Sequence, residues 1–391
     1  MLPDFEPRLH AFAEVIVRVG LNLQRGQRLL IAEPYELQGV ARSTEVIVET
    51  VIKTAAADAE VIWGDGPRLR EFAEKADWRG FAQLAGNNAR RLADGVRRGD
   101  ALLFLQSSQP RLLDGLPAGR VAELRRIGWE HFGPVAQQLV QGATNWTVAP
   151  APSPAWAQAV YADLPSEQRL AALWQEVFTA TRVNEPAPFA AWQVHLRLLR
   201  QRRDALNARQ LTSLRYKGEG TDLTVTLPPG HIWRTAQLTT QSGTSFVANL
   251  PTEEVFTAPH RDSAEGTVRI SRPISYGGAV ISGIELEFKR GRVTAAQART
   301  GADLLKQLLD TDEGARRLGE VAIVAEDTSL ARAGRLFYHP LLDENAQSHV
   351  ALGDGYGFCL RRPDPTVLNR SLIHVDLPFD ASLILPGTEP S

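Results

Sequence analysis

The sequence predicts an α/β protein in which an N-terminal open parallel sheet with flanking helices precedes a C-terminal α+β region with a largely antiparallel sheet. Strand-like and helix-like apolar segments alternate through the first half of the chain. From Leu211 onward, period-2 segments separated by glycine or proline replace them. The length of 391 residues exceeds one compact core of ordinary size, which favours two domains.

The first half of the chain reads as alternating helices and strands. Apolar spacing predicts the order helix 9–19, strand 28–32, helix 43–59, strand 60–65, helix 79–95 and strand 101–107. Because parallel strands need a crossover connection, usually a helix, this alternation favours a parallel sheet built from right-handed crossovers. Three further helices are predicted, with proline-rich residues 149–156 after the first of them: 121–140, 166–183 and 189–208.

The second half has the pattern of an antiparallel sheet. Strands are predicted in the segments LTSLRYKG, TDLTVTL, GTVRISRPI and AVISGIELEF, which alternate with period 2. We therefore expect an N-terminal α/β domain of residues 1–200 and a C-terminal domain of residues 201–391.

Composition excludes several classes of partner and site. The 43 Lys and Arg against 45 Asp and Glu give a formal charge of −2, so no basic field is available for nucleic acid or an anionic membrane. The single Cys359 excludes an internal disulfide and any multi-cysteine metal site, and it favours a cytoplasmic location. We identify no secretory signal and no run of the ~18 apolar residues that a membrane span needs.

Glycine motifs give no support for nucleotide binding. The segments KGEGTD and YGGAV lack the third glycine opening a helix that a dinucleotide fingerprint needs. Neither contains the lysine of a P-loop in the required position.

The segment SLIHVDLPF places His374 and Asp376 on one face of a predicted strand. Aliphatic residues alternate with them, and a side-chain period of two puts the imidazole and carboxylate roughly 7 Å apart along the strand. Such a pair is either a pair of metal ligands or a buried hydrogen-bonded pair that supports the sheet.

Two other segments carry candidate site residues. In DENAQSHVALGDGYG, Glu344 and His349 would lie about 140° apart on a straight helix, so either the segment bends or only one of them is a ligand. The alternative is a solvated loop or a capped helix start. Leucines at 308, 309 and 318 predict an amphipathic helix ending near Gly319. Glu320 would then stand where the strand of residues 321–324 begins, either aimed into a site or exposed.

The segment NLPTEEVFTAPH places two adjacent glutamates between prolines. Pro251 and Pro259 leave too little room for a helix, so the segment is expected to be extended. Neighbouring side chains then face opposite ways, and only one of Glu253 and Glu254 can point inward. The pattern by itself leaves both choices open.

Several carboxylates and two imidazoles without a thiolate are the ligand types expected of a hydrolytic two-metal centre. Divalent ions held roughly 3.5–4 Å apart repel each other, and bridging carboxylates offset that repulsion. Histidines add neutral ligands that temper the total charge. If the segments above converge, the sequence therefore predicts metal-assisted hydrolysis.

The chain resembles the aminopeptidase T family of metallopeptidases, which also includes aminopeptidase II and PepS. The resemblance covers essentially the whole length and rests on NLPTEEVFTAP, TDEGARRLGEVA, LLDENAQSH, IHVD, VGLNL, TNWT and GTDLTV, of which the first two are highly specific. The segments QSGTSFVA and RDSAEGTV depart from the family pattern, and these departures bear on substrate preference more than on catalysis.

This resemblance implies two divalent metal ions per subunit, zinc, cobalt or magnesium, in the C-terminal domain. Carried over by position, the implied ligands are Glu254, Glu320, His349, His374 and Asp376, with Glu344 as a sixth. Tyr356 corresponds to a tyrosine beside the metals and is expected to polarise the substrate carbonyl or stabilise the oxyanion. The resemblance also implies a homodimer that encloses the sites and admits short peptides with a free N-terminus.

The expected function is a metallo-aminopeptidase that releases single N-terminal amino acids through a metal-activated water. Glu320 is the candidate acid–base group, although it is also an expected ligand. One alternative keeps the metals but changes the reaction to that of a dipeptidase, a carboxypeptidase or an amidohydrolase. Another is a non-catalytic peptide or metabolite binder with the same fold.

Overall fold

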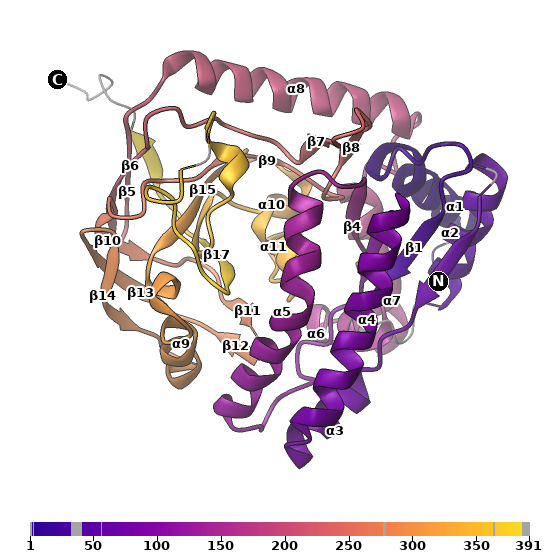
Figure 1. The fold of residues 1–391 in the computed structure, drawn as a ribbon, viewed down its shortest axis with the longest axis horizontal. Coiled ribbons are helices and arrows are strands. Elements are labelled where there is room, and N and C mark those ends of the chain that lie inside the picture. The colour runs from indigo at the N-terminus through magenta and orange to yellow at the C-terminus, as the bar shows by residue number, and fades with distance from the viewer. Residues whose placement is uncertain are drawn as a thin grey trace. The chain divides into compact units, whose positions relative to one another are not determined.

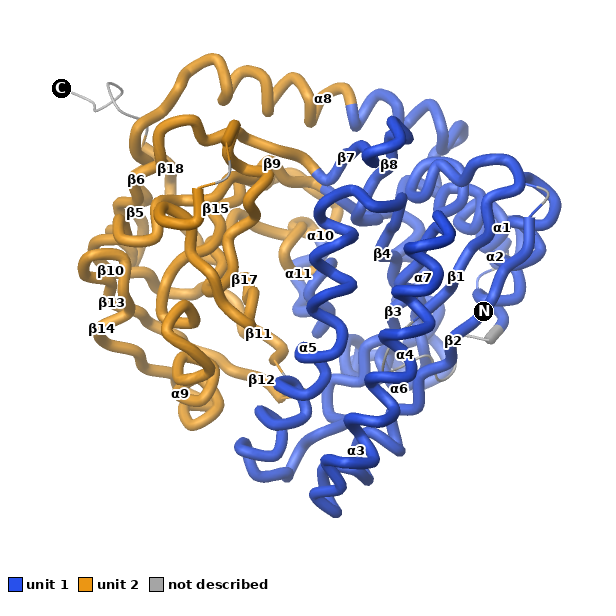
Figure 2. The backbone as a smooth tube through the Cα atoms, viewed as in Figure 1, with its two compact units in different colours: residues 1–196, 236–252, 333–341 blue, residues 197–235, 253–332, 342–391 orange. Residues whose placement is uncertain are grey.

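The computed structural model describes residues 2, 4–32, 41–55, 57–276, 279–362 and 364–384. The chain separates into two compact units, and each unit is assembled from three segments (Figure 2). Unit 1 contains residues 1–196, 236–252 and 333–341, and unit 2 contains residues 197–235, 253–332 and 342–391. No helix within the described ranges is long and apolar enough to cross a membrane.

Unit 1 is built on a parallel sheet, as the sequence predicts. Within the described ranges four strands form it in the order β2-β1-β3-β4, and every neighbouring pair is parallel. Strands β1 and β4 of this sheet are labelled in Figure 1. Their bounds are β1 Leu29–Ala32, β2 Ala59–Ile62, β3 Ala101–Gln106 and β4 Trp146–Pro150. The short hairpin of β7 Gln237–Thr239 and β8 Ser245–Val247 also belongs to unit 1.

Helices accompany this sheet, and two of them supply much of its core. Leu92 of α4 and Leu139 of α5 pack against Leu30, Leu102 and Phe104 of the strands. Strands buried on both faces need such continuous apolar runs. The helices are α1 Phe5–Val15, a π-helical turn η1 Ile16–Gly20, α2 Ala41–Ala55, α3 Gly66–Lys75, α4 Trp78–Arg98, α5 Ala118–Val140, α6 Pro154–Val160 and α7 Ser166–Ala180. Helix α8, Pro188–Arg209, begins in unit 1 and ends in unit 2.

Three of these elements, α3, β4 and α6, are not anticipated by sequence periodicity. The prolines at 150 and 154 suggest a loop, yet Pro154 occupies the first turn of α6, where its missing N–H costs nothing. Ser153 caps this helix, because its hydroxyl accepts a hydrogen bond from the N–H of Trp156.

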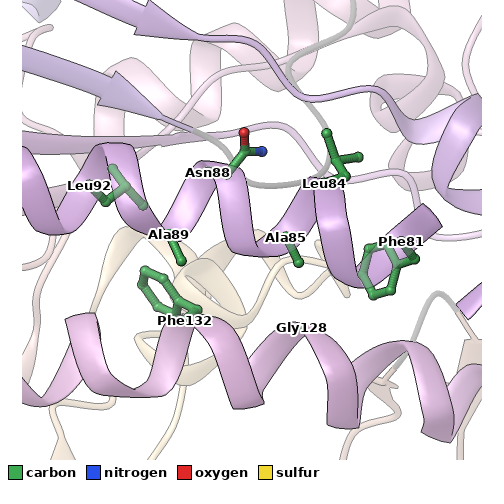
Figure 3. Close-up of a pocket in the computed structure, with 8 residues that line it drawn as sticks. All are labelled: Phe81, Leu84, Ala85, Asn88, Ala89, Leu92, Gly128 and Phe132. Carbon is green, nitrogen blue, oxygen red and sulfur yellow. The ribbon is translucent and has the colours of Figure 1, made fainter. Parts of the chain in front are cut away.

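A small apolar pocket lies between α4 and α5 in unit 1 (Figure 3). In this view Ala89 and Phe132 face each other from the two helices, and Asn88 is the one amide side chain among the lining residues. None of the lining residues is titratable. The pocket therefore lacks the groups that bind metals or carry protons in a hydrolase.

Unit 2 contains two larger antiparallel sheets. The first runs β14-β13-β10-β6-β5-β18 within the described ranges, and the second runs β17-β16-β15-β9. The pairings within both are antiparallel, as the sequence predicts for this half. The first sheet comprises β5 Ser213–Gly218, β6 Thr221–Thr226, β10 Glu265–Arg269, β13 Glu285–Lys289, β14 Arg292–Gln297 and β18 Ser382–Ile384.

The second sheet carries the segments that the sequence singles out. Its strands are β9 Glu254–Thr257, β15 Leu318–Val324, β16 His349–Gly353 and β17 His374–Pro378. The remaining elements are the hairpin β11 Ile274–Tyr276 with β12 Ala279–Ile281, the helices α9 Ala302–Leu309, α10 Ser329–Ala333 and α11 Pro340–Glu344, and the 3₁₀ turns η2 Glu313–Arg316 and η3 Gly357–Cys359.

The predicted helix that ends near Gly319 is wrong. Helix α9 ends at Leu309, a 3₁₀ turn follows, and β15 already begins at Leu318. Asp312 has an extended backbone and caps the start of this turn by accepting a hydrogen bond from the N–H of Ala315, so no continuous helix can pass through it. Glu320 consequently lies inside a strand, and not before its start.

Candidate metal centre

The strand register explains how distant residues reach one face of a sheet. Phe256 on β9 and His349 on β16 both pair with Ala322 of β15. Paired residues share a face, and Glu254 shares the face of Phe256 because side chains alternate along a strand. On β16 the small residues Ala351 and Gly353 lie opposite Asp376 and His374. This face of the sheet therefore places carboxylate and imidazole side chains opposite small residues.

The residues named by the sequence come together within unit 2. Two groups have ligand atoms within 4.8 Å of one another: Glu254 with Glu320 and His349, and Glu320 with His374 and Asp376. Glu344 ends α11, and Tyr356 directly precedes the turn η3. The structure replaces the straight helix considered for residues 344–349 with a helix end followed by a strand.

The imidazole of His349 lies among three carboxylates. Its Nε2 atom is 3.5 Å from Oε2 of Glu254, 3.5 Å from Oε1 of Glu320 and 3.8 Å from Oδ1 of Asp376. His349 and Glu320 are 1% and 4% exposed, so this part of the site is closed to solvent. One buried imidazole is therefore close to three carboxylates, and a positive charge among them would offset their mutual repulsion.

Glu320 connects the two groups. One oxygen, Oε1, faces His349, whereas the other, Oε2, lies 3.7 Å from Nε2 of His374. His374 Nε2 is also 3.5 Å from Oδ1 of Asp376. A carboxylate that directs each oxygen to a different imidazole has the arrangement of a bridging ligand.

Backbone carbonyls select the tautomer of both imidazoles. Nδ1 of His349 lies 3.1 Å from the carbonyl of Gln347, and Nδ1 of His374 lies 2.9 Å from the carbonyl of Asp354. Because a carbonyl oxygen can only accept, each Nδ1 carries a hydrogen. In the neutral rings the lone pair is then on Nε2 and directed at the carboxylates, as metal ligation requires.

Of the two adjacent glutamates, Glu254 points toward the cluster. It is 5% exposed, and its Oε2 atom has no hydrogen-bond partner among the described residues. Burying a carboxylate oxygen without a partner is costly, which makes a cation the group that fits there. Glu253 is also buried, but it belongs to neither group of donor atoms found among the described residues.

The pKa values reflect an excess of negative charge. Burial, followed by the charge of Glu320, raises the pKa of Glu254 to about 8. Burial and the charge of Asp376 raise the pKa of Glu344 well above its ordinary value. Burial alone would lower the pKa of His349, but its hydrogen bond to Glu320 and the nearby carboxylates raise it to about 10. These raised pKa values mean that the three groups retain protons more readily than usual, and a bound cation would replace the protons in offsetting the negative charge.

The second imidazole and its carboxylate lie on the open side of the cluster. Burial alone would lower the pKa of His374, but its contact with Asp376 raises this pKa to about 9. Burial alone would raise the pKa of Asp376, but His374 holds this pKa below its usual range. Their side chains are 23% and 17% exposed, against 7% or less for the other three donors. His374 and Asp376 are therefore the more solvent-accessible donors of the cluster.

Tyr356 stands next to this open side. Its ring centroid lies 5.0 Å from that of His374 and 5.2 Å from that of Phe358, to which it is nearly parallel. Burial and the charge of Glu320 raise the pKa of the Tyr356 hydroxyl well above its ordinary value. The phenol therefore stays protonated near neutral pH and can donate a hydrogen bond.

The chemistry of the donor set fits divalent cations. Oxygen and imidazole nitrogen donors of this kind, with a shared carboxylate and no thiolate, are typical of metal-dependent hydrolases. The two carbonyls that orient the imidazoles could not be found from the sequence, because a backbone carbonyl carries no residue signature.

Comparison with known proteins identifies the protein family to which this chain is similar. Residues 5–386 match the family described as "Thermophilic metalloprotease (M29)". Aminopeptidase T of Thermus thermophilus is 40% identical over 378 residues, 95% of this chain and 92% of the relative. Aminopeptidase AmpS of Bacillus subtilis is 35% identical over 383 residues, 96% and 93% of the two chains. A solved structure described as wild-type AmpT from Thermus thermophilus superposes with a TM-score of 0.85 at 38% identity, covering 95% and 92%.

The chain belongs to the M29 family of metallopeptidases. It is a peptide hydrolase, and the expected family resemblance is confirmed over nearly the whole length.

Proposed function

We propose that the protein is a metal-dependent aminopeptidase that releases single N-terminal amino acids from short peptides. Relatives named aminopeptidase support the reaction class, and the arrangement of Glu320 supports a pair of ions. Glu254, Glu320 and His349 would hold one ion, and Glu320, His374 and Asp376 the other. Glu344 is the sixth proposed ligand.

When bound, two divalent ions such as zinc, cobalt or magnesium would polarise the peptide carbonyl and lower the pKa of a water molecule. The remaining work falls to side chains of this chain. The protonated Tyr356 hydroxyl donates a hydrogen bond to the oxygen on which negative charge develops. Glu320 is the candidate for carrying a proton to the leaving amine, in addition to its role as a ligand.

Chelation tests the metal requirement. The protein is stripped with a chelator, dialysed, and assayed on unblocked dipeptides and tripeptides before and after zinc, cobalt or magnesium is restored. We expect activity to disappear and to return with metal, at about two ions per chain by elemental analysis. Full turnover by the stripped protein would exclude the proposal.

N-acetylated copies of the same peptides test the reaction type. An aminopeptidase needs the free α-amine, so the blocked peptides should not be cleaved. Cleavage of blocked peptides at the C-terminal bond would instead favour a carboxypeptidase, and turnover confined to dipeptides would favour a dipeptidase. Binding of peptide without any turnover in the metal-loaded protein would favour a non-catalytic binder.

A homodimer, a cytoplasmic location and the domains 1–200 and 201–391 stay predictions. Light scattering coupled to size exclusion tests the dimer, with twice the chain mass of 42.9 kDa as the expected result. A monomer at assay concentration would contradict it.

A further inference from the structure

We propose that Asn345 is a positioning residue of the metal centre, whose side-chain amide fixes the carboxylates of Glu254 and Glu344 relative to each other. The inference rests on the proposed metal-dependent function. It concerns a residue outside the proposed ligand set, and it is carried by hydrogen bonds that join two segments far apart in the sequence.

Both ends of the Asn345 amide are engaged. Its Oδ1 atom accepts a hydrogen bond of 2.6 Å from the backbone N–H of Glu253, and its Nδ2 atom donates a hydrogen bond of 3.2 Å to Oε1 of Glu344. A backbone N–H can only donate, so the amide oxygen must face Glu253 and the amide nitrogen must face Glu344. The orientation of the side chain is therefore unique.

The surroundings leave this amide little freedom. Asn345 is 0% exposed, and its backbone carbonyl accepts a hydrogen bond of 3.3 Å from the hydroxyl of Thr328. A buried amide that is hydrogen-bonded at both polar ends fixes the positions of the two segments relative to each other. Removal of the side chain would leave the N–H of Glu253 without this acceptor in the protein interior.

The two segments that Asn345 connects each supply a carboxylate to the cluster. Glu254 follows the bonded N–H directly and begins β9, and Glu344 ends α11. The hydrogen bond from Asn345 is made to Oε1 of Glu344, whose side chain also forms a hydrogen bond with Asp376. An asparagine in this place sets the separation of two anionic ligands without adding a third charge.

Three variants test the proposal. Asn345→Ala removes both hydrogen bonds. Asn345→Asp keeps the shape and the acceptor for the Glu253 N–H but places an anionic oxygen against Glu344. Thr328→Val is the matched control, because it removes a buried hydrogen bond to the same residue without altering the amide. Each is purified, stripped of metal and checked for folding by circular dichroism.

The decisive readouts concern metal binding by folded protein. A chromophoric competitor gives the zinc dissociation constant, and the visible absorption of the cobalt-loaded protein reports ligand geometry. We expect Asn345→Ala to weaken zinc binding about 10- to 100-fold. We expect Asn345→Asp to alter the cobalt spectrum, and Thr328→Val to bind within about twofold of the unmodified chain with an unchanged spectrum, even if its melting temperature falls.

The outcomes separate failure of this inference from failure of the proposed function. Wild-type protein that binds no divalent metal would overturn the metal centre itself. Wild-type protein that binds metal, together with Asn345→Ala of equal affinity and Asn345→Asp of unchanged spectrum, would overturn the inference alone. Equal loss of affinity in Thr328→Val and Asn345→Ala would also overturn it, since the effect would then follow from general destabilisation.

Discussion

Nε2 of His349 lies 3.5 Å from Oε2 of Glu254, and both side chains are buried. The carboxylate oxygen has no hydrogen-bond partner among the described residues. We predict that Glu254→Gln reduces zinc affinity at least about 10-fold and peptide hydrolysis about 100-fold or more, because a neutral amide cannot offset the charge of an ion. Metal analysis and steady-state kinetics measure both effects.

The adjacent residue supplies a matched control. Glu253→Gln makes the same chemical change at an adjacent buried residue that belongs to neither group of donor atoms found among the described residues. It should keep its metal content and most of its activity. In the stripped protein near neutral pH, Glu254→Gln should melt at a higher temperature than the unmodified chain, because folding no longer has to neutralise a carboxyl group whose pKa is raised by burial and by Glu320. Equal behaviour of the two variants would contradict the assignment of Glu254.

Tyr356 offers a test of oxyanion stabilisation. Tyr356→Phe removes the hydroxyl and keeps the ring that stacks on Phe358 and His374. We expect kcat to fall about 100- to 1000-fold with little change in KM or in metal content, since the lost hydrogen bond strengthens only as charge develops. Steady-state kinetics on an unblocked dipeptide provides the measurement.

Phe358→Leu is the companion variant, because it disturbs the aromatic stack but leaves the hydroxyl in place. It should lower kcat far less than Tyr356→Phe. If both variants lost activity equally, the tyrosine would act through packing and not through its hydrogen bond.

Gly319 lies against the backbone carbonyl of Asp354, which orients the imidazole of His374. A side chain at this residue would overlap the carbonyl oxygens of Gly353 and Asp354. The second carbonyl accepts the hydrogen bond from Nδ1 of His374. Gly319→Ala should therefore lower the free energy of unfolding by about 1–3 kcal/mol and weaken metal binding about 10-fold. Denaturant titration and zinc competition measure the two effects.

Gly357→Ala is the control for this experiment. An added Cβ there would meet nothing within 4 Å, although the residue follows Tyr356 directly. It should retain stability and metal affinity. Retention of full zinc affinity by Gly319→Ala would show that the carbonyl of Asp354 does not determine how His374 is oriented.

The sequence was most informative where local pattern decides local structure. Alternation around His374 and Asp376 predicted one shared face, and β17 confirms it. The prediction of a helix that ends near Gly319 is wrong because Asp312 has an extended backbone and caps a short 3₁₀ turn, which the leucine spacing does not reveal. Convergence of Glu254 with Glu320 depends on strand pairing between distant segments, which no local period encodes. In the sequence, only the family resemblance implies that these two residues belong to one site.

The pH dependence of stability provides a final test, at a residue of unit 1 that is not a proposed ligand. His339 is 1% exposed and stacks on Trp156, with ring centroids 4.9 Å apart. Burial lowers the pKa of His339 to about 4. Its ordinary value in an unfolded chain is about 6.5, so between these values the unfolded state binds more protons than the folded state.

The sign of the effect follows from this difference. The stability associated with neutral His339 is complete above about pH 6.5 and is lost as the pH falls toward about 4, by up to about 3 kcal/mol. His339→Phe keeps a stacking ring without a titrating group, so its free energy of unfolding should fall less between pH 7 and pH 4.5. Urea denaturation of the metal-stripped proteins at both pH values measures this difference, and an equal fall in the two proteins would contradict the prediction.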